Sequence, residues 1–384
     1  MKRGAWAFLG LVLLASSFRA LELLHRISLS RRPAPAPTVR PRPPSVEPLP
    51  PDVKRRPSEP APPAIDSYAP HVATRGHFER RDSQWAHTLS YGFVDHHRRE
   101  QTITCDISRA DHELQLQRYG YDPKALEREL DARLMPFVQA ELRSRGLEAV
   151  VHMTFKGGGA YEARSSFTDE TPVDERVRLA GEVKRFYAWL DAGYEREQQR
   201  VEQALYAERG VRLSGNRLTP DHVGLAVRAA RPLADCFRAL ARASSGDSDR
   251  RRLGLFLAFL QEIPYEVPPD RYQGREILGL FVPTEVLVGR HGDCDSKAVT
   301  FASLWRNFDT PLLLISLPRH MLLGVAVTPA PGEHYVQVGN RYFVLCEVAG
   351  PGKLHPGREP LPGAFEYILI EPATSGRVAR GRSS

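Results

Sequence analysis

Residues Pro283 to Trp305 read PTEVLVGRHGDCDSKAVTFASLW, and they carry a cysteine, Cys294, to the first turn of an expected helix. Small and apolar residues follow at helical spacing, so that one face of the helix would pack inward: Ala298, Phe301, Ala302 and Trp305. Gly289 and Gly292 allow the preceding loop to turn sharply. The unpartnered N–H groups and the positive end of the helix dipole are therefore expected to favour the thiolate form of Cys294.

A thiolate nucleophile needs a base, and the base needs a group that orients it. Residues 312–327, LLLISLPRHMLLGVAV, predict a strand, a proline-containing turn and a second strand that begins at His320. Residues 341–350, RYFVLCEVAG, predict a further strand that carries Glu347. The separations from Cys294 to His320 and from His320 to Glu347 are 26 and 27 residues. That is long enough for a helix leading into a sheet whose neighbouring strands bring the three groups together.

These residues resemble the transglutaminase-like branch of the papain-like fold, and especially the bacterial transglutaminase-like cysteine proteinases. The resemblance rests on GDCDSKA at residues 292–298, on the PTEVL lead-in, on His320 at the start of a strand and on Glu347. It covers roughly residues 254–371. It implies an α+β domain of papain-like or transglutaminase-like type, in which the helix carrying Cys294 packs on an antiparallel sheet and the three residues form a catalytic triad. The family usually has Asp where this chain has Glu347, so the orienting carboxylate keeps its charge but changes its reach.

Other histidines could take the place of His320: His291, His334 and His355. His291 lies three residues before the cysteine and is interpreted as a loop ligand or a solvated side chain. His334 lies in a GEH turn and is expected to be exposed.

The cysteine and the acid also have ordinary structural interpretations. Cys294 could be inert core, because cysteine is among the most often buried residues. Glu347 could be a surface residue of its strand. Cys346 would point to the opposite face of that strand and is expected in the core.

Two carboxylates flank the nucleophile, and both oppose thiolate formation. Some proteinases of the resembled family bind calcium with acidic residues beside their cysteine, and Asp293 and Asp295 match that placement. Calcium is therefore a possible cofactor at Asp293 and Asp295, although two carboxylates are too few to specify a site. We expect no other cofactor.

Composition divides the chain before the cysteine domain. A short basic start precedes an apolar run from Gly4 to Phe18, which suits a signal peptide, with a retained membrane anchor as the alternative. Residues 31–70 hold 14 of the 32 prolines and are expected to form an extended spacer. The expected division is a signal peptide or anchor at 1–30, a disordered proline-rich linker at 31–75, a smaller α/β or α+β region at 76–245, the cysteine domain at 246–372 and a disordered tail at 373–384.

The region 76–245 has its own helices and strands by pattern. Strands are predicted at 87–93, 101–107 and 147–155, and helices at 122–145, 172–209 and 221–243. The helix at 172–209 could pair in a coiled coil or pack on its own domain, and Val173 and Val177 begin its apolar stripe. The pair His96-His97 and the run Asp111-His112-Glu113 are interpreted as solvated rather than metal-binding, and Gly157–Gly159 as a turn.

The net positive charge of the chain comes from its first 80 residues. These hold a net charge of +7, and the other 304 residues carry 40 basic and 40 acidic side chains. This distribution gives no support for nucleic-acid binding and favours contact of the N-terminal segment with anionic lipid or envelope polymer. Four cysteines in an exported protein could form disulfides; with Cys294 reduced, Cys105 and Cys236 are the reasonable pair.

We therefore expect an exported or membrane-anchored cysteine peptidase or amidase, periplasmic or facing the envelope, that acts on a protein or peptide through a thioester. The alternatives are amine acyl transfer of transglutaminase type, a catalytically silent binding module, and an envelope scaffold. The sequence does not decide the oligomeric state.

Overall fold

The computed structural model describes residues 53–54, 77–349, 352–361, 363–372 and 378–383. These form helices and antiparallel sheets, which confirms the α+β class. The chain divides into two compact units. Unit 1 contains Tyr121–Glu208 and Leu213–Arg217, and unit 2 contains the other described residues. The expected export segment at 1–30 lies outside the described residues.

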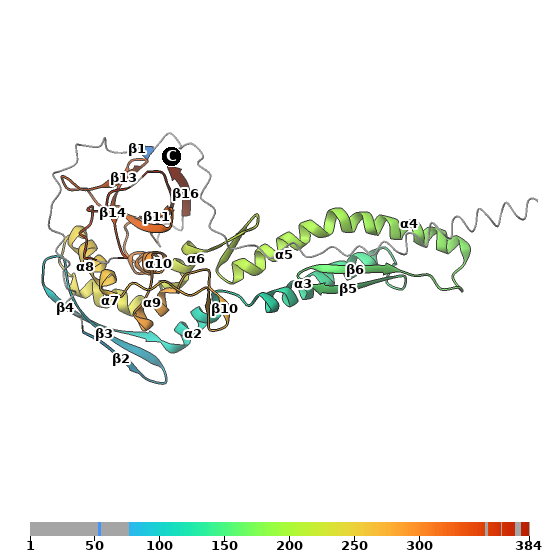
Figure 1. The fold of residues 1–384 in the computed structure, drawn as a ribbon, viewed down its shortest axis with the longest axis horizontal. Helices are drawn as coiled ribbons and strands as arrows, with labels where there is room; N and C mark the ends of the chain where they lie inside the picture. Colours follow the sequence, from blue (N-terminus) through green and yellow to red (C-terminus); the bar gives the residue numbers. More distant parts are fainter. Residues whose placement is uncertain (1–52, 55–76, 350–351, 362, 373–377, 384) are drawn as a thin grey trace, which may run out of the picture. The chain divides into compact units, whose positions relative to one another are not determined.

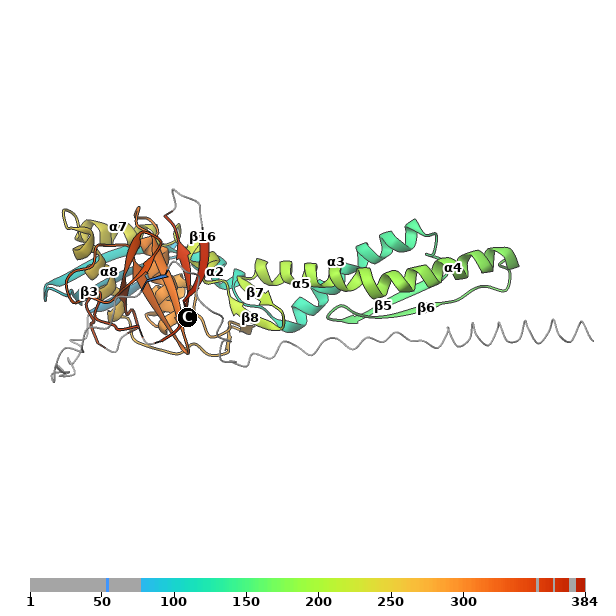
Figure 2. The ribbon, with the colours of Figure 1, turned by 90° about the horizontal axis from the view of Figure 1, so that it is seen from above.

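Unit 1 is built from one long helix, a second helix and a hairpin (Figure 1). Its elements are α3 (Pro123–Ser144), β5 (Val151–Gly157), β6 (Ala160–Ser165), α4 (Val173–Trp189), the π-helical turn η1 (Leu190–Tyr194) and α5 (Glu195–Glu208). Because α4, η1 and α5 are contiguous, the long helix expected at 172–209 is confirmed. It packs within its own unit, where α3 runs alongside α5 (Figure 2).

The sequence signals of unit 1 act as expected at helix and hairpin ends. Asp122 caps α3, with its side chain accepting a hydrogen bond from the N–H of Lys124 at 2.9 Å. Gly157–Gly159 forms the tight turn between β5 and β6, and all three residues have positive φ. The expected apolar stripe of the long helix is wrong at its start, because Val173 and Val177 are 73% and 70% exposed. Leu179 and Val183 are the buried residues there.

Unit 2 is organised around a seven-stranded antiparallel sheet, counted over the described residues, with the order β1-β13-β14-β12-β11-β15-β16. Its strands are β1 (Val53–Lys54), β11 (Leu312–Leu317), β12 (His320–Val325), β13 (Tyr335–Val338), β14 (Arg341–Cys346), β15 (Phe365–Ile370) and β16 (Val378–Ser383). Alternate residues of the central strands, such as Leu313, Leu322 and Phe343, form one apolar cluster. The helix α10 (Cys294–Trp305) packs against β11 and β12.

At both edges of this sheet, segments that we expected to be disordered form strands. Val53 and Lys54, inside the expected linker, pair with β13. Val378–Ser383, inside the expected disordered tail, pairs with β15 along its whole length. An edge strand offers unpaired N–H and C=O groups, so a segment can join it through its backbone without an apolar pattern of its own.

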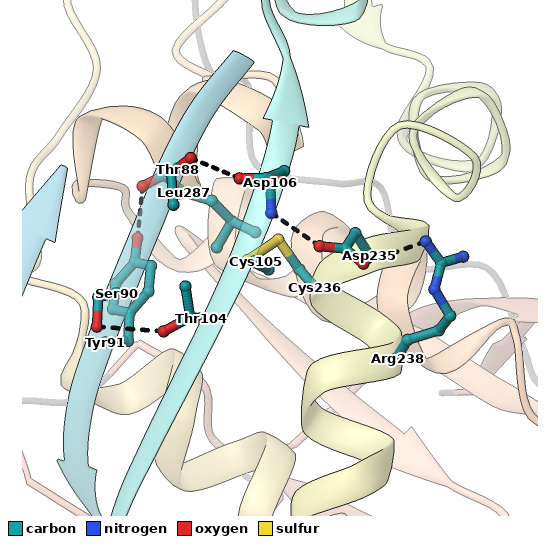
Figure 3. Close-up of a disulfide and its surroundings, with 10 residues drawn as sticks. All are labelled: Thr88, Ser90, Tyr91, Thr104, Cys105, Asp106, Asp235, Cys236, Arg238 and Leu287. Carbon is teal, nitrogen blue, oxygen red and sulfur yellow. Dashed lines mark hydrogen bonds and ion pairs between the residues drawn. A yellow bond between two sulfur atoms is a disulfide. The ribbon is translucent and has the colours of Figure 1, made fainter. Parts of the chain in front are cut away.

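A second, three-stranded sheet of unit 2 is joined to a helix by a disulfide. Its strands are β2 (Phe78–Asp82), β3 (Ala86–Val94) and β4 (Glu100–Ser108), and α2 (Arg109–Arg118) follows directly. Cys105 of β4 is bonded to Cys236 of α7 (Ala234–Ala243), which confirms the expected pair (Figure 3). Next to the disulfide, the N–H of Asp106 donates to Asp235 at 2.9 Å. The other two cysteines, Cys294 and Cys346, are free and buried.

One helix that the sequence predicted in unit 2 is interrupted. The single helix expected at 221–243 is two, α6 (His222–Ala229) and α7, because Pro232 cannot continue a helix from the turn before it. The other elements of unit 2 are α8 (Asp249–Glu262), β9 (Arg271–Tyr272), β10 (Arg275–Glu276) and α9 (Pro283–Gly289). The hairpin of β7 (Val211–Ser214) and β8 (Arg217–Pro220) has residues in both units.

The two compact units do not meet near residue 245, where the sequence predicted a domain boundary. Residues 77–120 belong to unit 2 together with the cysteine-bearing helix. The disulfide and the packing of α7 on β4 and of α8 on β3 hold them there. Over the described residues, we find no helix with the length and apolar character that a membrane span requires.

Candidate functional site

Cys294 is the first residue of α10, as the sequence predicts. The preceding helix, α9, ends at Arg290, which adopts a left-handed conformation with φ of 55°. Asp293 caps α10, and its Oδ1 accepts hydrogen bonds from the N–H of Ser296 at 3.0 Å and from the hydroxyl of Ser296 at 2.6 Å. Since every residue of α10 except Asp295 is buried, the position of Cys294 is fixed by the core.

The surroundings of the Cys294 thiol favour its protonated form. The residue is 6% exposed, and its Sγ donates a hydrogen bond to Oδ1 of Asp295 at 3.3 Å. Burial raises the pKa of the Cys294 thiol, and the charges of Asp295 and Asp293 raise it further. The backbone N–H of Met321 opposes them by donating toward the sulfur. The expectation that the helix terminus favours the thiolate is thus not met, because burial and the two carboxylates outweigh it.

His320 and Glu347 form a close pair. The Nε2 atom of His320 lies 2.6 Å from Oε2 of Glu347. The other carboxylate oxygen accepts the N–H of Ala349 at 2.6 Å, and the Glu347 residue is only 7% exposed. The hydrogen bond to Glu347 raises the pKa of His320 despite partial burial. Glu347 is therefore placed to orient the imidazole.

The sheet explains how two residues far apart in sequence meet. His320 is the first residue of β12, as expected. β12 pairs with β14 in a register that sets Leu323 opposite Cys346. Glu347 follows the last residue of β14 and so is not within the strand, which corrects that expectation. Cys346 is fully buried, as the alternation of strand side chains predicts.

Cys294 lies close to the pair of His320 and Glu347. The N–H of Met321, next to His320, is directed at the sulfur of Cys294. The charge of Asp295 raises the pKa of both Cys294 and His320. Within the described residues no hydrogen bond joins the thiol to the imidazole, and Nδ1 of His320 is the ring nitrogen left for a further partner.

Lys297 is a site residue that our sequence reasoning missed. It is fully buried, and its ammonium group donates to the carbonyl oxygens of Ile263 and Ala349, the latter at 3.0 Å. Burial lowers the pKa of Lys297 to about 8, while Glu347 and Asp293 oppose that shift. The amine thus links the end of α8, the segment after Glu347 and the nucleophile helix. Its place in GDCDSKA, one turn after Cys294, was the available signal.

Two further residues on α8 and α6 support the same groups. Gln261 donates to the carbonyl oxygens of Glu347 at 2.7 Å and Leu354 at 2.9 Å, which fixes the segment that follows β14. His222 has its Nε2 atom 3.7 Å from Oδ2 of Asp295. When protonated, His222 partly neutralises the carboxylate that accepts the thiol proton. No local sequence motif indicates either residue.

A buried chain of imidazoles and carboxylates lies beside the loop before Cys294. His112 contacts His87 through Nδ1 and Nε2 at 3.1 Å, and its other nitrogen lies 2.8 Å from Oε2 of Glu285. The far nitrogen of His87 lies 2.7 Å from Asp82. His112 is 7% exposed, so the solvated interpretation of His112 is wrong: its partners come from other elements of the fold.

Glu285 is the hydrogen-bond acceptor of this chain. Burial would raise the pKa of Glu285, but hydrogen bonds to His112, His291 and Tyr272 outweigh it and lower this pKa to about 2. Glu285 therefore holds His112 and His291 through its two carboxylate oxygens.

His291 completes the chain at the loop itself. Its two ring nitrogens lie 3.1 Å from Glu285 and 3.2 Å from Glu266, so both act as donors. The hydrogen bond to Glu285 raises the pKa of His291. The ring also stacks on Phe281 with centroids 4.2 Å apart. His291 is therefore held in the loop by two carboxylates and an aromatic ring, so it is neither solvated nor a substitute for His320.

The other histidines are accounted for in different ways. His334 is exposed, as expected. His355 stacks on His96 with ring centroids 4.5 Å apart. Burial lowers the pKa of His96 to about 4, so the solvated interpretation is wrong for His96 as well.

Asp293 and Asp295 do not fit a calcium site well. Asp293 is engaged in capping α10, and Asp295 contacts Cys294 and His222. Across the described residues, no group of three or more His, Cys, Asp and Glu side chains is arranged to hold a metal ion. We derive no chemical step through a metal.

Comparisons of the chain with protein-family models, curated proteins and solved structures found no match in any of the three. The family resemblance drawn from GDCDSKA therefore stays a prediction. What the geometry itself provides is a buried thiol at a helix terminus beside an imidazole and carboxylate pair.

Proposed function

We propose that this protein is a cysteine peptidase or amidase that uses Cys294, His320 and Glu347, in a domain of papain-like or transglutaminase-like type. The observation that carries the proposal is the 2.6 Å contact between His320 and Glu347. Over the described residues it leaves Nδ1 of His320 without a hydrogen bond. A partly buried imidazole that a carboxylate orients near a cysteine is the arrangement that nucleophilic catalysis needs. The antiparallel sheet under α10 supports the fold assignment.

The reaction follows from these positions. Nδ1 of His320 accepts the proton of Cys294, and the sulfur attacks the carbonyl carbon of an amide. The N–H of Cys294, at the start of α10, stabilises the negative charge on the carbonyl oxygen. The imidazolium then protonates the leaving amine as the C–N bond breaks, and a thioester remains. Water hydrolyses the thioester to an acid and restores the thiol, whereas an amine in place of water gives the transglutaminase outcome.

The disulfide supports an exported location, because such bonds persist in oxidising compartments. An exported or membrane-anchored protein, periplasmic or facing the envelope, fits this bond. Its substrate would be a protein or peptide in the same compartment.

One observation favours a second function, a catalytically silent binding module. The thiol of Cys294 donates to Asp295, and burial with two carboxylates raises its pKa. A thiol that never ionises would leave the domain only its surfaces for binding.

The rate of alkylation of Cys294 by iodoacetamide between pH 5 and 10 separates the two functions. Mass spectrometry locates the label, because Cys346 is a second, fully buried thiol. The peptidase proposal expects a rate that is already high well below the free-thiol pKa of about 8.5. It also expects His320→Ala to lower this rate at least tenfold and Glu347→Gln to lower it less.

The matched control is His334→Ala, which removes an exposed histidine. A rate that rises only above pH 8.5, and is the same in the wild type and in His320→Ala, would favour the binding module. If the dyad is active, mixing the protein with a peptide amide and quenching in acid should trap a thioester on Cys294. Including an amine then shows whether water or amine is the preferred acceptor.

A further inference from the structure

A pocket of about 180 Å³ lies between α2 and α6 in unit 2. None of its lining residues belongs to the site of Cys294, His320 and Glu347. The volume slightly exceeds the roughly 150 Å³ of an engineered cavity that holds benzene. It suits a side chain or a small anion and is too small for a nucleotide.

Three arginines line this pocket: Arg118, Arg228 and Arg231. Within the described part of the chain, none of them forms a hydrogen bond or an ion pair with a carboxylate. Other arginines of unit 2 are paired, such as Arg212 with Asp221 at 2.7 Å and Arg341 with Glu371 at 2.9 Å. Partial burial of its side chain lowers the pKa of Arg228; the charge of Asp221 opposes this shift and the charge of Arg118 adds to it. All three arginine residues are exposed overall, and the carboxylates near them are Asp111 and Asp221. Three arginines against two carboxylates leave an excess of positive charge, which favours an anion.

A fourth donor has a fixed orientation. The Oε1 atom of Gln115 accepts a hydrogen bond from the hydroxyl of Thr284 at 3.0 Å. The amide N–H₂ group at the other end of this side chain is buried and has no hydrogen-bond partner among the described residues. Buried polar groups are nearly always paired, so an unpaired donor in a pocket lining indicates a missing acceptor.

The other lining residues define the rest of the ligand. Asp111 is the one acidic side chain of the lining, so the positive charges exceed the negative ones. Leu114, Leu225 and Pro232 supply apolar surface. A carboxylate or phosphate on an organic stem matches both the donors and the apolar wall.

The position of the pocket relates it to the cysteine. His222, the first residue of α6, lies 3.7 Å from Asp295, which directly follows Cys294. Arg228 lies six residues further along α6, about 9 Å from His222 along the helix at a rise of about 1.5 Å per residue. An extended peptide needs about three residues to cover this part of the path, and further residues to reach Cys294 itself.

We propose that this pocket binds an acidic side chain of a peptide substrate, more than three residues from the amide bond that Cys294 attacks. The proposal rests on the proposed peptidase function for its choice of ligand. It makes the enzyme selective for acidic peptides, with Arg228 as a specificity residue.

The test measures peptide binding in the full chain carrying Cys294→Ala, so that no turnover is needed. The probes are a fluorescent octapeptide of alanine and glycine with one central glutamate, the same peptide with glutamine, and inorganic phosphate. We expect the glutamate peptide to bind at least tenfold more tightly than the glutamine peptide. Arg228→Gln and Arg118→Gln should each remove most of this difference, and Arg228→Lys should restore part of it.

The matched control is Arg98→Gln, which removes an exposed arginine at the turn between β3 and β4. Equal binding of the two peptides, or binding that Arg228→Gln does not change, overturns the proposal. If phosphate displaces the glutamate peptide only in proteins that retain Arg228, a shared anion pocket is supported. If phosphate binds there and the two peptides bind equally, the pocket takes a free anion and the peptide proposal is wrong.

The outcome for the pocket is separate from that for the proposed function. Two results together would support the pocket proposal and contradict the peptidase proposal. These are tighter binding of the glutamate peptide and alkylation of Cys294 only above pH 8.5. If Cys294 is alkylated rapidly well below pH 8.5 but the two peptides bind equally, the peptidase proposal is supported and the pocket proposal is wrong.

Discussion

Replacing Lys297 by methionine should change how the stability of unit 2 depends on pH. Burial lowers the pKa of this amine to about 8 in the folded protein, against 10.5 for an unperturbed lysine. Between these two values the unfolded chain binds a proton that the folded chain has lost, so stability rises with pH in this window. The gain between pH 7 and pH 10 is about 2 to 3 kcal/mol, since each pKa unit corresponds to about 1.4 kcal/mol. The Met variant lacks this gain.

Urea denaturation at pH 7, 8, 9 and 10 measures the effect in a Cys294→Ala background, which removes a thiol that could exchange with the disulfide. The difference in free energy of unfolding between the parent and Lys297→Met should move by about 2 to 3 kcal/mol in favour of the parent as the pH rises. Other groups that titrate in this range cancel in the difference. Lys184→Met, at an exposed lysine of unit 1, is the control. Parallel pH profiles for the parent and Lys297→Met would show that the buried amine does not titrate here, which refutes the reasoning.

Three further predictions concern the framework of unit 2. Replacing Cys105 and Cys236 by alanine should lower stability by about 2 to 5 kcal/mol in a denaturation experiment, because the disulfide joins residues 131 apart; no loss would mean that the bond is not formed in solution. Glu285→Gln should lower the free energy of unfolding by about 2 to 3 kcal/mol at pH 7. The stabilisation from the Glu285 carboxylate is present above pH 4.5 and is lost only as the pH falls toward about 2. Equal stability of the two proteins at pH 7 would contradict this. Finally, EDTA should leave the alkylation rate of Cys294 unchanged, because Asp293 and Asp295 are engaged by protein groups; a loss that calcium restores would reinstate the metal.

Local signals predicted the parts of the site that depend on neighbouring residues. The cysteine begins α10 because Asp293 caps the helix, and His320 begins β12 because Pro318 and Arg319 turn the chain. The disulfide was predicted by elimination, since only two cysteines remained once Cys294 and Cys346 were assigned. In each case a few adjacent residues, or a very small set of choices, decided the outcome.

Contacts between distant residues could not be predicted in the same way. His112 meets Glu285 across 173 residues, and nothing within several positions of either one indicates the other. The edge strands at Val53 and at Val378–Ser383 pair through backbone groups that every residue has. The protonation of Cys294 also depended on burial, which the helix pattern alone does not measure.

The structure leaves two groups that could take the proton of Cys294. The thiol donates to Asp295, whereas His320 contacts Glu347. Burial alone would raise the pKa of Asp295, but interactions led by His222 outweigh it and lower that pKa, which makes Asp295 a poor base. The pKa of His320 is raised, chiefly by its hydrogen bond to Glu347. An imidazole whose pKa is raised is a better proton acceptor than a carboxylate whose pKa is lowered.

Asp295→Asn distinguishes the two groups. Removing its charge should lower the pKa of Cys294 by about one unit or more and raise the alkylation rate at pH 7 about tenfold, because each pKa unit changes the thiolate fraction tenfold. His222→Gln should act in the opposite direction, since it removes the imidazole that lowers the pKa of Asp295. If Asp295→Asn instead slows alkylation as much as His320→Ala does, the carboxylate is the base, and the pair of His320 and Glu347 serves another step, such as protonating the leaving amine.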